Sequence, residues 1–406
     1  MVQNVATCPI WLEKHINRNN GAISFRKFMD LSLNDPENGA YATGRLQIGK
    51  KGDFTTSPSM NSEFADLLAI QIIDWINQIS SSLEINEKIF LIDIGPGEGT
   101  LSRDLIFAIE KISKPVLNYL EIIFIETNKG MIEKQKKTFE KIKNISYSWK
   151  TYKEIKSSSI SGIVLAHEIL DALPVERITF VKDRFYRVGV EIKEQEDKKV
   201  ISLCNLPLHK PLENSITNIT QKYKFKLPPL SSEDGWTTEW NLDLKDWFKE
   251  ISRILKFGTV LIVDYVLDQK RYFTSARSDG TIISYKNNSG YLNILSEAGK
   301  RDLTAHLCLE LIKYYSEENG FTYLGDVSQG MALLSLGLAN RISLLSEYSK
   351  QDLSLALEKR ETLLRLVDPI TLGSFKWIAL QYSNKKKLLN CNENIKTKFL
   401  LDPAPT

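Results

Sequence analysis

Residues 88–112 (KIFLIDIGPGEGTLSRDLIFAIEKI) determine the fold that the sequence predicts. A short apolar run is followed by a glycine-rich turn at 95–99 and then by apolar residues at helical spacing. This order predicts a strand, a tight turn and a helix, because each part has the periodicity or the breaker residues of that structure. The segment is therefore interpreted as the first strand and helix of an α/β sheet.

The rest of the chain repeats this alternation of strands and helices. Residues 120–125 (LEIIFI) and 160–166 (ISGIVLA) have the short apolar runs of buried strands, and residues 129–142 between them have a helical pattern. Further strands are expected at 145–149, 259–265, 321–324 and 375–381, and further helices at 242–255, 305–319 and within 331–367. Parallel strands need long crossovers, which helices supply, so a parallel, doubly wound α/β sheet is expected.

The composition of the chain excludes some classes of protein. The 406 residues include 53 Lys plus Arg and 50 Asp plus Glu, a formal net charge of +3, so no nucleic-acid partner is expected. The four cysteines form no C-x-x-C pair, which predicts neither a metal cluster nor a disulfide framework. No apolar run approaches the roughly 20 residues of a membrane helix, and the N-terminus lacks the pattern of a secretory signal. We expect a soluble protein of a bacterial cytoplasm.

The turn after the first strand carries an acid-and-glycine motif, residues 93–99 (DIGPGEG), where α/β sheets place their ligands. A dinucleotide fingerprint needs a further glycine where this chain has Thr100, which disfavours a nicotinamide oxidoreductase. The spacing D-x-G-x-G-x-G is typical of methyltransferases that use S-adenosyl-L-methionine; a purely structural glycine turn is the alternative. Glu126, at the end of the second strand, is placed to accept hydrogen bonds from ribose hydroxyls. The predicted cofactor-binding residues are Asp93, Gly95, Gly97, Gly99 and Glu126.

A second motif, residues 166–174 (AHEILDALP), follows the fourth expected strand, whose end faces the transferred methyl group in this class of fold. Glu168 and Asp171 are three residues apart, so their carboxylates converge if the turn is helical. The alternative is an ordinary helix start with Asp171 on the surface. The segment lacks the Asn/Asp-Pro-Pro-aromatic run of enzymes that methylate amino groups of DNA.

Residues 49–58 (GKKGDFTTSP) form a third candidate motif, which includes Asp53. The run is either a loop over a ligand or a turn that caps the helix expected from about Asn61. On these residues alone the cap is favoured.

Nearly the whole chain resembles the MidA family of S-adenosyl-L-methionine-dependent methyltransferases, which is related to the mitochondrial complex I assembly factor that dimethylates an arginine. The motif at 95–101 (GPGEGTL) matches the family closely, and other matching blocks follow in the family's order. These blocks are 23–29, 36–41, 52–58, 168–175, Gly235 with Glu239, 264–265, 302–306, 329–330 and 373–380. Three positions depart from the family's pattern: His167 replaces Asn, Val266 replaces Gly, and a histidine expected shortly after Tyr285 is absent.

The resemblance implies a Rossmann-like, seven-stranded class I methyltransferase sheet with an N-terminal extension and large insertions. The expected divisions are 1–85, a helical and loop block over the active site; 86–175, the first half of the methyltransferase domain; 176–235, an antiparallel insertion that forms a substrate lid; 236–383, the second half, with a helical insertion at 331–367; and 384–406, a flexible tail. Residues 267–303 are expected to be mainly loop.

The resemblance also implies a protein substrate that is methylated on arginine, with a subunit of NADH dehydrogenase as the implied partner. A guanidinium holds five donors and stays protonated, so carboxylates are needed to grip it. Glu168 and Asp171 are the candidates for this role, with Asp53 and His306 as secondary catalytic-site residues, and no metal is expected. Two alternatives stay open: a small-molecule methyltransferase, and a non-catalytic assembly factor that binds the cofactor.

Overall fold

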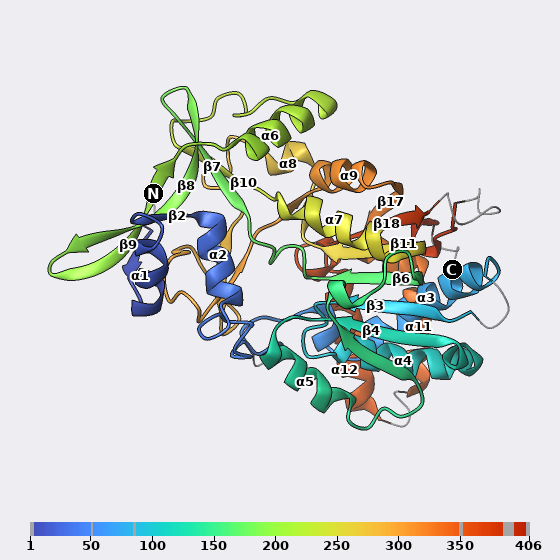
Figure 1. The fold of residues 1–406 in the computed structure, drawn as a ribbon. Coiled ribbons are helices and arrows are strands. Elements are labelled where there is room, and N and C mark those ends of the chain that lie inside the picture. The colour runs from blue at the N-terminus through green and yellow to red at the C-terminus, as the bar shows by residue number, and fades with distance from the viewer. Residues whose placement is uncertain (1–3, 50–51, 84–86, 349–351, 385–393, 403–406) are drawn as a thin grey trace.

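The computed structural model describes residues 4–49, 52–83, 87–348, 352–384 and 394–402. One part of the molecule is a seven-stranded sheet with helices on both faces. The other part is an antiparallel sheet that carries the two N-terminal helices (Figure 1). The chain therefore combines the expected α/β core with a second, separate layer of structure.

The seven-stranded sheet has the order β17-β18-β11-β6-β3-β4-β5. Its strands are β3 (Ile89–Ile94), β4 (Leu120–Ile125), β5 (Ser146–Lys150), β6 (Ile160–His167), β11 (Leu255–Asp264), β17 (Phe321–Ser328) and β18 (Lys376–Ser383). The strand order runs outward in opposite directions from β3 and β6. Such a switch point is where doubly wound sheets bind ligands, at the carboxyl ends of the strands.

Helices cover both faces of this sheet. On one face lie α3 (Glu63–Ser80), α4 (Thr100–Ser113), α5 (Lys129–Phe139), α10 (Gln329–Ser335), α11 (Leu338–Tyr348) and α12 (Leu353–Val367). On the other lie α6 (Lys210–Tyr223), α7 (Asp243–Ile254), α8 (Gln269–Tyr272) and α9 (Leu309–Glu318). Because both faces are covered, β6 is buried along its whole length. Among the described residues, no helix combines the length and apolar character that crossing a membrane requires.

The expected seven-stranded α/β sheet is confirmed, and one of its strands departs from the parallel arrangement, because β18 runs antiparallel to both β11 and β17. Ser328 at the end of β17 pairs with Lys376 at the start of β18. The helices α10, α11 and α12 therefore leave and rejoin the sheet at the same end. A connection of that kind returns the chain in the opposite direction.

The second sheet joins segments from the N-terminus and from the insertion after β6. Its strands, in the order β1-β9-β8-β7-β10 with β2 beside β8, are β1 (Val5–Thr7), β2 (Ala22–Ser24), β7 (Glu176–Val181), β8 (Arg184–Gln195), β9 (Lys198–Leu206) and β10 (Trp236–Trp240). The helices α1 (Ile10–Asn17) and α2 (Phe25–Asn34) pack on it. Residues 1–85 are therefore not one block, because α3 belongs to the core of the main sheet.

Residues 267–303 contain more structure than the sequence predicts. A three-stranded sheet, β14-β13-β15, is formed by β13 (Ile283–Lys286), β14 (Ser289–Tyr291) and β15 (Asp302–Thr304), and β12 (Val266–Leu267) pairs with β16 (Leu307–Cys308). These strands are two to four residues long. Strands this short carry too few residues for a period-2 pattern to be recognised. We call β13, β14 and β15 the small sheet.

The expectation of a free C-terminal tail is wrong for residues 394–402. The Phe399 side chain is fully buried, with its ring 5.9 Å from that of Trp75 and 5.2 Å from that of Trp377. Ile395 is also buried. Residues 385–393 and 403–406, also part of the predicted tail, lie outside the described residues.

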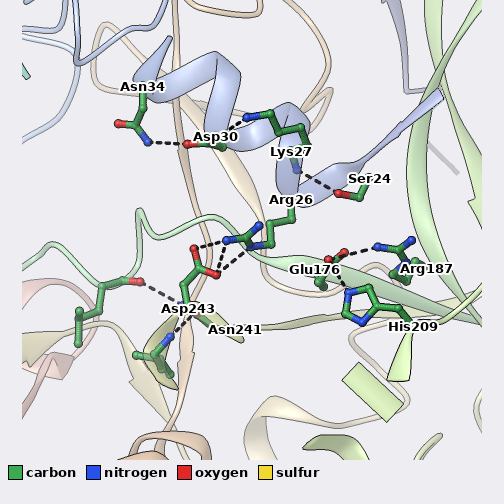
Figure 2. Close-up of polar contacts among 12 residues, drawn as sticks. Ser24, Arg26, Lys27, Asp30, Asn34, Glu176, Arg187, His209, Asn241 and Asp243 are labelled. Atoms are coloured by element: carbon green, nitrogen blue, oxygen red, sulfur yellow. Dashed lines mark hydrogen bonds and ion pairs between the residues drawn. The ribbon is translucent and has the colours of Figure 1, made fainter. Parts of the chain in front are cut away.

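An ion pair joins the two parts of the molecule (Figure 2). Arg26 on α2 donates from Nε to Oδ1 of Asp243 at 2.8 Å and from Nη2 to Oδ2 at 3.0 Å, and Asp243 is the first residue of α7. Close to this pair, Glu176 contacts Arg187 at 3.5 Å and His209 at 3.3 Å. The N-terminal helix α2 is thus held against α7, on the main sheet, by two hydrogen bonds.

Candidate active site

The glycine turn between β3 and α4 brings the backbone close to a cavity. Gly95, Gly97 and Gly99 have φ angles of 58°, 55° and 80°, which residues other than glycine rarely adopt. A Cβ atom at Gly97 would lie 2.9 Å from Cδ1 of Ile48. The backbone conformation therefore favours glycine at all three positions, and a Cβ at Gly97 would also push aside the end of the Ile48 side chain.

The cavity beside this turn has a volume of about 320 Å³ and lies at the switch point of the main sheet. Its floor is formed by residues that follow β3, β4 and β6. Its other walls come from the segment 41–59, from α2 and from α7. Lining residues include Asp93, Gly95, Gly97, Glu126, Met131, His167, Glu168, Ile48, Phe54, Pro58, Leu33 and Trp247. A cavity of this size and mixed lining fits a nucleoside-containing ligand.

Glu126 is held in a fixed position before any ligand binds. Its Oε1 atom accepts hydrogen bonds from the backbone N–H groups of Thr127 and Asn128, each at 2.8 Å. Its Oε2 atom accepts one from Gln135 at 3.2 Å. Burial raises the pKa of Glu126. An oriented carboxylate at this place is suited to accept hydrogen bonds from ribose hydroxyls, as the sequence predicts.

Asp93 lies at the floor of the same cavity, at the end of β3. It accepts a hydrogen bond of 2.6 Å from Oγ of Ser102 on α4. Burial raises the pKa of Asp93 to about 7. Its carboxylate and the glycine turn thus belong to one rigid strand-to-helix connection.

The turn after β6 places Glu168 and Asp171 together without forming a helix. Glu168 has a φ of 50°, a left-handed conformation that is rare outside glycine. Its N–H donates to the carbonyl of Val263 at 2.8 Å. The carboxylate of Asp264 accepts from the N–H groups of Leu170 at 3.0 Å and Asp171 at 3.3 Å. The two carboxylates converge because Asp264 anchors this turn, and the predicted helical spacing is wrong as the reason.

A second cavity, which we call the side cavity, adjoins the first and has a volume of about 110 Å³. The two cavities share Tyr41, Phe54 and Glu168 as lining residues. The side cavity is also lined by Thr55, Asp171, Tyr265, Tyr285, Asn288, Asp302 and Thr304. Acidic and aromatic side chains therefore dominate its wall.

Three buried carboxylates, Glu168, Asp171 and Asp302, line the side cavity, and the buried carboxylate of Asp264 anchors the turn that carries the first two. Asp171, Asp264 and Asp302 are 6%, 0% and 2% exposed, and the Glu168 side chain is 8% exposed. Burial raises the pKa of all four, with Asp264 at about 7 and Asp302 at about 6; nearby carboxylates raise the pKa of Glu168 and Asp171 further. Within the described ranges, no Lys or Arg forms an ion pair with any of the four.

His167, which precedes Glu168, does not neutralise these carboxylates. Its Nδ1 atom lies 3.6 Å from Oε1 of Glu168, and burial lowers the pKa of the ring to about 3, so His167 is neutral. The part of the chain that the structure describes contains no group of three acidic, His or Cys side chains arranged to hold a metal.

Two of the predicted site residues lie outside both cavity walls. The carboxylate of Asp53 accepts from the N–H groups of Gln47 at 3.0 Å and Asn287 at 3.3 Å, and so holds the segment 41–59 against the small sheet. The ring of His306 packs edge-on against Tyr265 with centroids 5.7 Å apart. Burial and nearby arginines lower the pKa of His306 to about 4. Both residues support wall residues without lining the site.

Neither cavity is lined by a residue of 176–235, the segment expected to form a substrate lid. The covering structure comes instead from the segment 41–59 and from the small sheet. Sequence reasoning also missed Tyr41, Phe54, Tyr285 and Asp302 as site residues. A signal existed only for those within the resembling blocks, such as Asp302, which opens the block at 302–306.

Comparison with known proteins identifies the family. A family model described as "Putative S-adenosyl-L-methionine-dependent methyltransferase" (Methyltransf_28) matches residues 67–327, which include the glycine turn and the three carboxylates that line the side cavity. This chain belongs to that family. S-adenosyl-L-methionine is therefore its cofactor, and the larger cavity, with its glycine turn and oriented Glu126, has the size and lining to hold it.

Similar proteins extend over most of the chain. A protein of Drosophila melanogaster named as a mitochondrial protein arginine methyltransferase NDUFAF7 homolog is 24% identical, covering 89% of this chain and 82% of that protein. The Bos taurus protein arginine methyltransferase NDUFAF7 is 25% identical, covering 89% and 81%. A crystal structure of a COG1565 superfamily member from Burkholderia thailandensis, bound to S-adenosyl-homocysteine, has a TM-score of 0.76 at 21% identity and covers 91% and 90% of the two chains. That likeness confirms the class I methyltransferase fold.

Proposed function

We propose that this methyltransferase transfers a methyl group to an arginine side chain of a protein substrate. The observation that carries the proposal is the side cavity, which adjoins the cofactor cavity and shares Glu168 with it. Its carboxylates have no Lys or Arg partner among the described residues, so a cation is the ligand that they favour. A guanidinium is such a cation and fits carboxylates through paired hydrogen bonds.

The residues of the larger cavity would hold the cofactor, the glycine turn on the side of its methionine part and Glu126 on the side of its ribose. When bound, S-adenosyl-L-methionine supplies an electrophilic methyl group on a sulfonium. Glu168 lies on the boundary between the two cavities, so it is placed to orient one guanidinium nitrogen toward that methyl group. Such positioning is the main contribution an enzyme makes to an in-line displacement.

Methylation of a guanidinium releases one proton, which the site must accept. The nitrogen forms a bond to carbon, the carbon–sulfur bond breaks, and the proton leaves the methylated nitrogen. The raised pKa values of Glu168 and Asp171 make either carboxylate a better proton acceptor than an exposed carboxylate. We assign the grip to both residues and the proton transfer to Glu168, because Glu168 borders the cofactor cavity.

The substrate class is supported by size and by similarity. The side cavity has about a third of the volume of the cofactor cavity, which suits the head group of a side chain. The curated relatives that cover most of this chain are named protein arginine methyltransferases. A subunit of an NADH dehydrogenase is the candidate partner, on the resemblance to the complex I assembly factor.

The test uses a lysate of source cells that lack this protein, supplied with methyl-labelled S-adenosyl-L-methionine. Wild-type protein should label a protein band. Glu168→Gln should reduce that labelling by about 100-fold or more while it still binds the cofactor. Label only in the small-molecule fraction would favour a small-molecule methyltransferase, and cofactor binding without any label would favour a scaffold; either result contradicts the proposal.

A further inference from the structure

Asp302 is the one acidic residue of the side cavity that comes from outside the main sheet and its turns. It is the first residue of β15, and β15 pairs with β13 in the small sheet. Glu168 and Asp171, by contrast, lie on the turn after β6. The small sheet therefore brings a third carboxylate to a cavity whose other two come from the methyltransferase core.

The orientation of the Asp302 carboxylate is fixed through one oxygen. Its Oδ1 atom accepts hydrogen bonds from the hydroxyl of Tyr41 at 3.1 Å and from the N–H of Leu303 at 2.9 Å. No hydrogen bond within the described residues reaches Oδ2. Asp302 is only 2% exposed and lines the side cavity, so its Oδ2 atom is left available to accept a hydrogen bond from a ligand there.

A purely structural role accounts for only part of this arrangement. The hydrogen bond to Tyr41 ties the segment 41–59 to the small sheet, and that alone would explain Oδ1. It does not explain why Asp302 is buried within electrostatic range of Asp171, with no Lys or Arg in the described residues to offset the repulsion.

We propose that Asp302 is a third substrate-binding carboxylate, and that Glu168, Asp171 and Asp302 together select a guanidinium over a primary ammonium. The inference rests on the proposed function and defines its substrate specificity. A guanidinium directs five N–H donors outward in one plane, whereas an ammonium is a compact charge with three donors. Carboxylates from two separate segments match the wider group, and Tyr41, Tyr265 and Tyr285 supply rings of the kind that guanidinium planes stack on.

The experiment compares two bisubstrate compounds, in which adenosine is joined at its 5′ carbon through a short alkyl chain to either a guanidine or a primary amine. Calorimetry measures their affinities for the wild type, for Asp302→Asn and for Asp197→Asn. Asp197 is an exposed residue in the β8–β9 turn and serves as the matched control. The affinity of each of the three proteins for S-adenosyl-homocysteine is measured as a control. These three affinities should agree within about twofold.

The wild type and Asp197→Asn should bind the guanidine compound at least about tenfold more tightly than the amine compound, and Asp302→Asn should lose most of this preference. Tyr41→Phe, which removes one hydrogen bond from Oδ1, should reduce the preference less, and it replaces Asp302→Asn if that variant fails to fold. A preference that survives in the folded variants, with only their thermal stability lowered, overturns the role of Asp302. A wild type with no preference for guanidine contradicts the proposed arginine site itself.

Discussion

Gly97 is the residue of the glycine turn whose substitution tests the cofactor cavity most simply. Its φ of 55° favours glycine, and a Cβ there would also push aside the end of the Ile48 side chain. Gly21 also has a positive φ, at 85°, but a Cβ there would have no atom within 4 Å. A substitution would therefore strain the backbone at both positions. Only at Gly97 would the new side chain also meet a neighbouring atom.

We predict that Gly97→Val loses at least about tenfold in affinity for S-adenosyl-L-methionine, because the side chain would displace Ile48 at the cofactor cavity. Gly21→Val should bind the cofactor as the wild type does, although each variant is destabilised by the strained backbone. Calorimetric titration of both variants makes the comparison. Equal affinities for the two would show that the glycine turn does not border the cofactor.

Asp302 should also make the stability of the protein depend on pH. Burial raises its pKa from near 3.8 to about 6, so the folded state binds more protons than the unfolded state between those values. Stability therefore falls as the pH rises through this window, and the loss is complete above about pH 6. Two pKa units correspond to about 3 kcal/mol, which is the upper limit of this loss.

Accordingly, Asp302→Asn should be more stable relative to the wild type at pH 7.5 than at pH 4.5, by about 1–3 kcal/mol in the free energy of unfolding. Urea denaturation of both proteins without ligand, at each pH, measures this difference. The groups that interact with Asp302 are Tyr41, Asp171, Asp53 and Tyr285, and they are unchanged in the comparison. A difference that does not depend on pH would mean that Asp302 is ionised as easily in the folded protein as in the unfolded chain.

Among the helices and strands, those that a single local pattern determines could be predicted from the sequence. Strands β3, β4 and β6 and the turn at 95–99 were predicted because apolar runs and glycines are contiguous in the chain. The small sheet was not predicted, because its strands are three or four residues long and β13 pairs with β15 across an intervening segment. The direction of β18 depends on where three preceding helices return the chain, which no local pattern records.

The C-terminal segment 394–402 is an element whose burial has a direct test. Phe399 is fully buried between the rings of Trp75 and Trp377, so Phe399→Ala should reduce the free energy of unfolding by about 3–5 kcal/mol. Leu401 is 63% exposed, and Leu401→Ala should change the free energy of unfolding by no more than about 0.5 kcal/mol. Urea denaturation of the two variants distinguishes a packed segment from a free tail. Similar small effects of both substitutions would contradict the packing.

At the scale of the whole molecule, the site lies where three distant parts of the chain meet. The main sheet supplies Glu126, Glu168 and Asp171, whose roles sequence motifs could suggest. Tyr41 and Asp302 are separated by 261 positions and touch only in the folded protein, so the acid-lined side cavity could not be predicted from the sequence. The cofactor half of the site is thus encoded locally, and the substrate half depends on tertiary structure.

The central claim is that the side cavity presents an arginine nitrogen to the methyl group. Tandem mass spectrometry of the protein labelled in the lysate locates the transferred methyl group on one residue. We predict that it lies on a guanidinium nitrogen of an arginine, and that it is absent when Glu168→Gln replaces the wild type. A methyl group on lysine, on a carboxylate or on a small molecule would contradict the account, and so would arginine methylation that persists undiminished in Glu168→Gln.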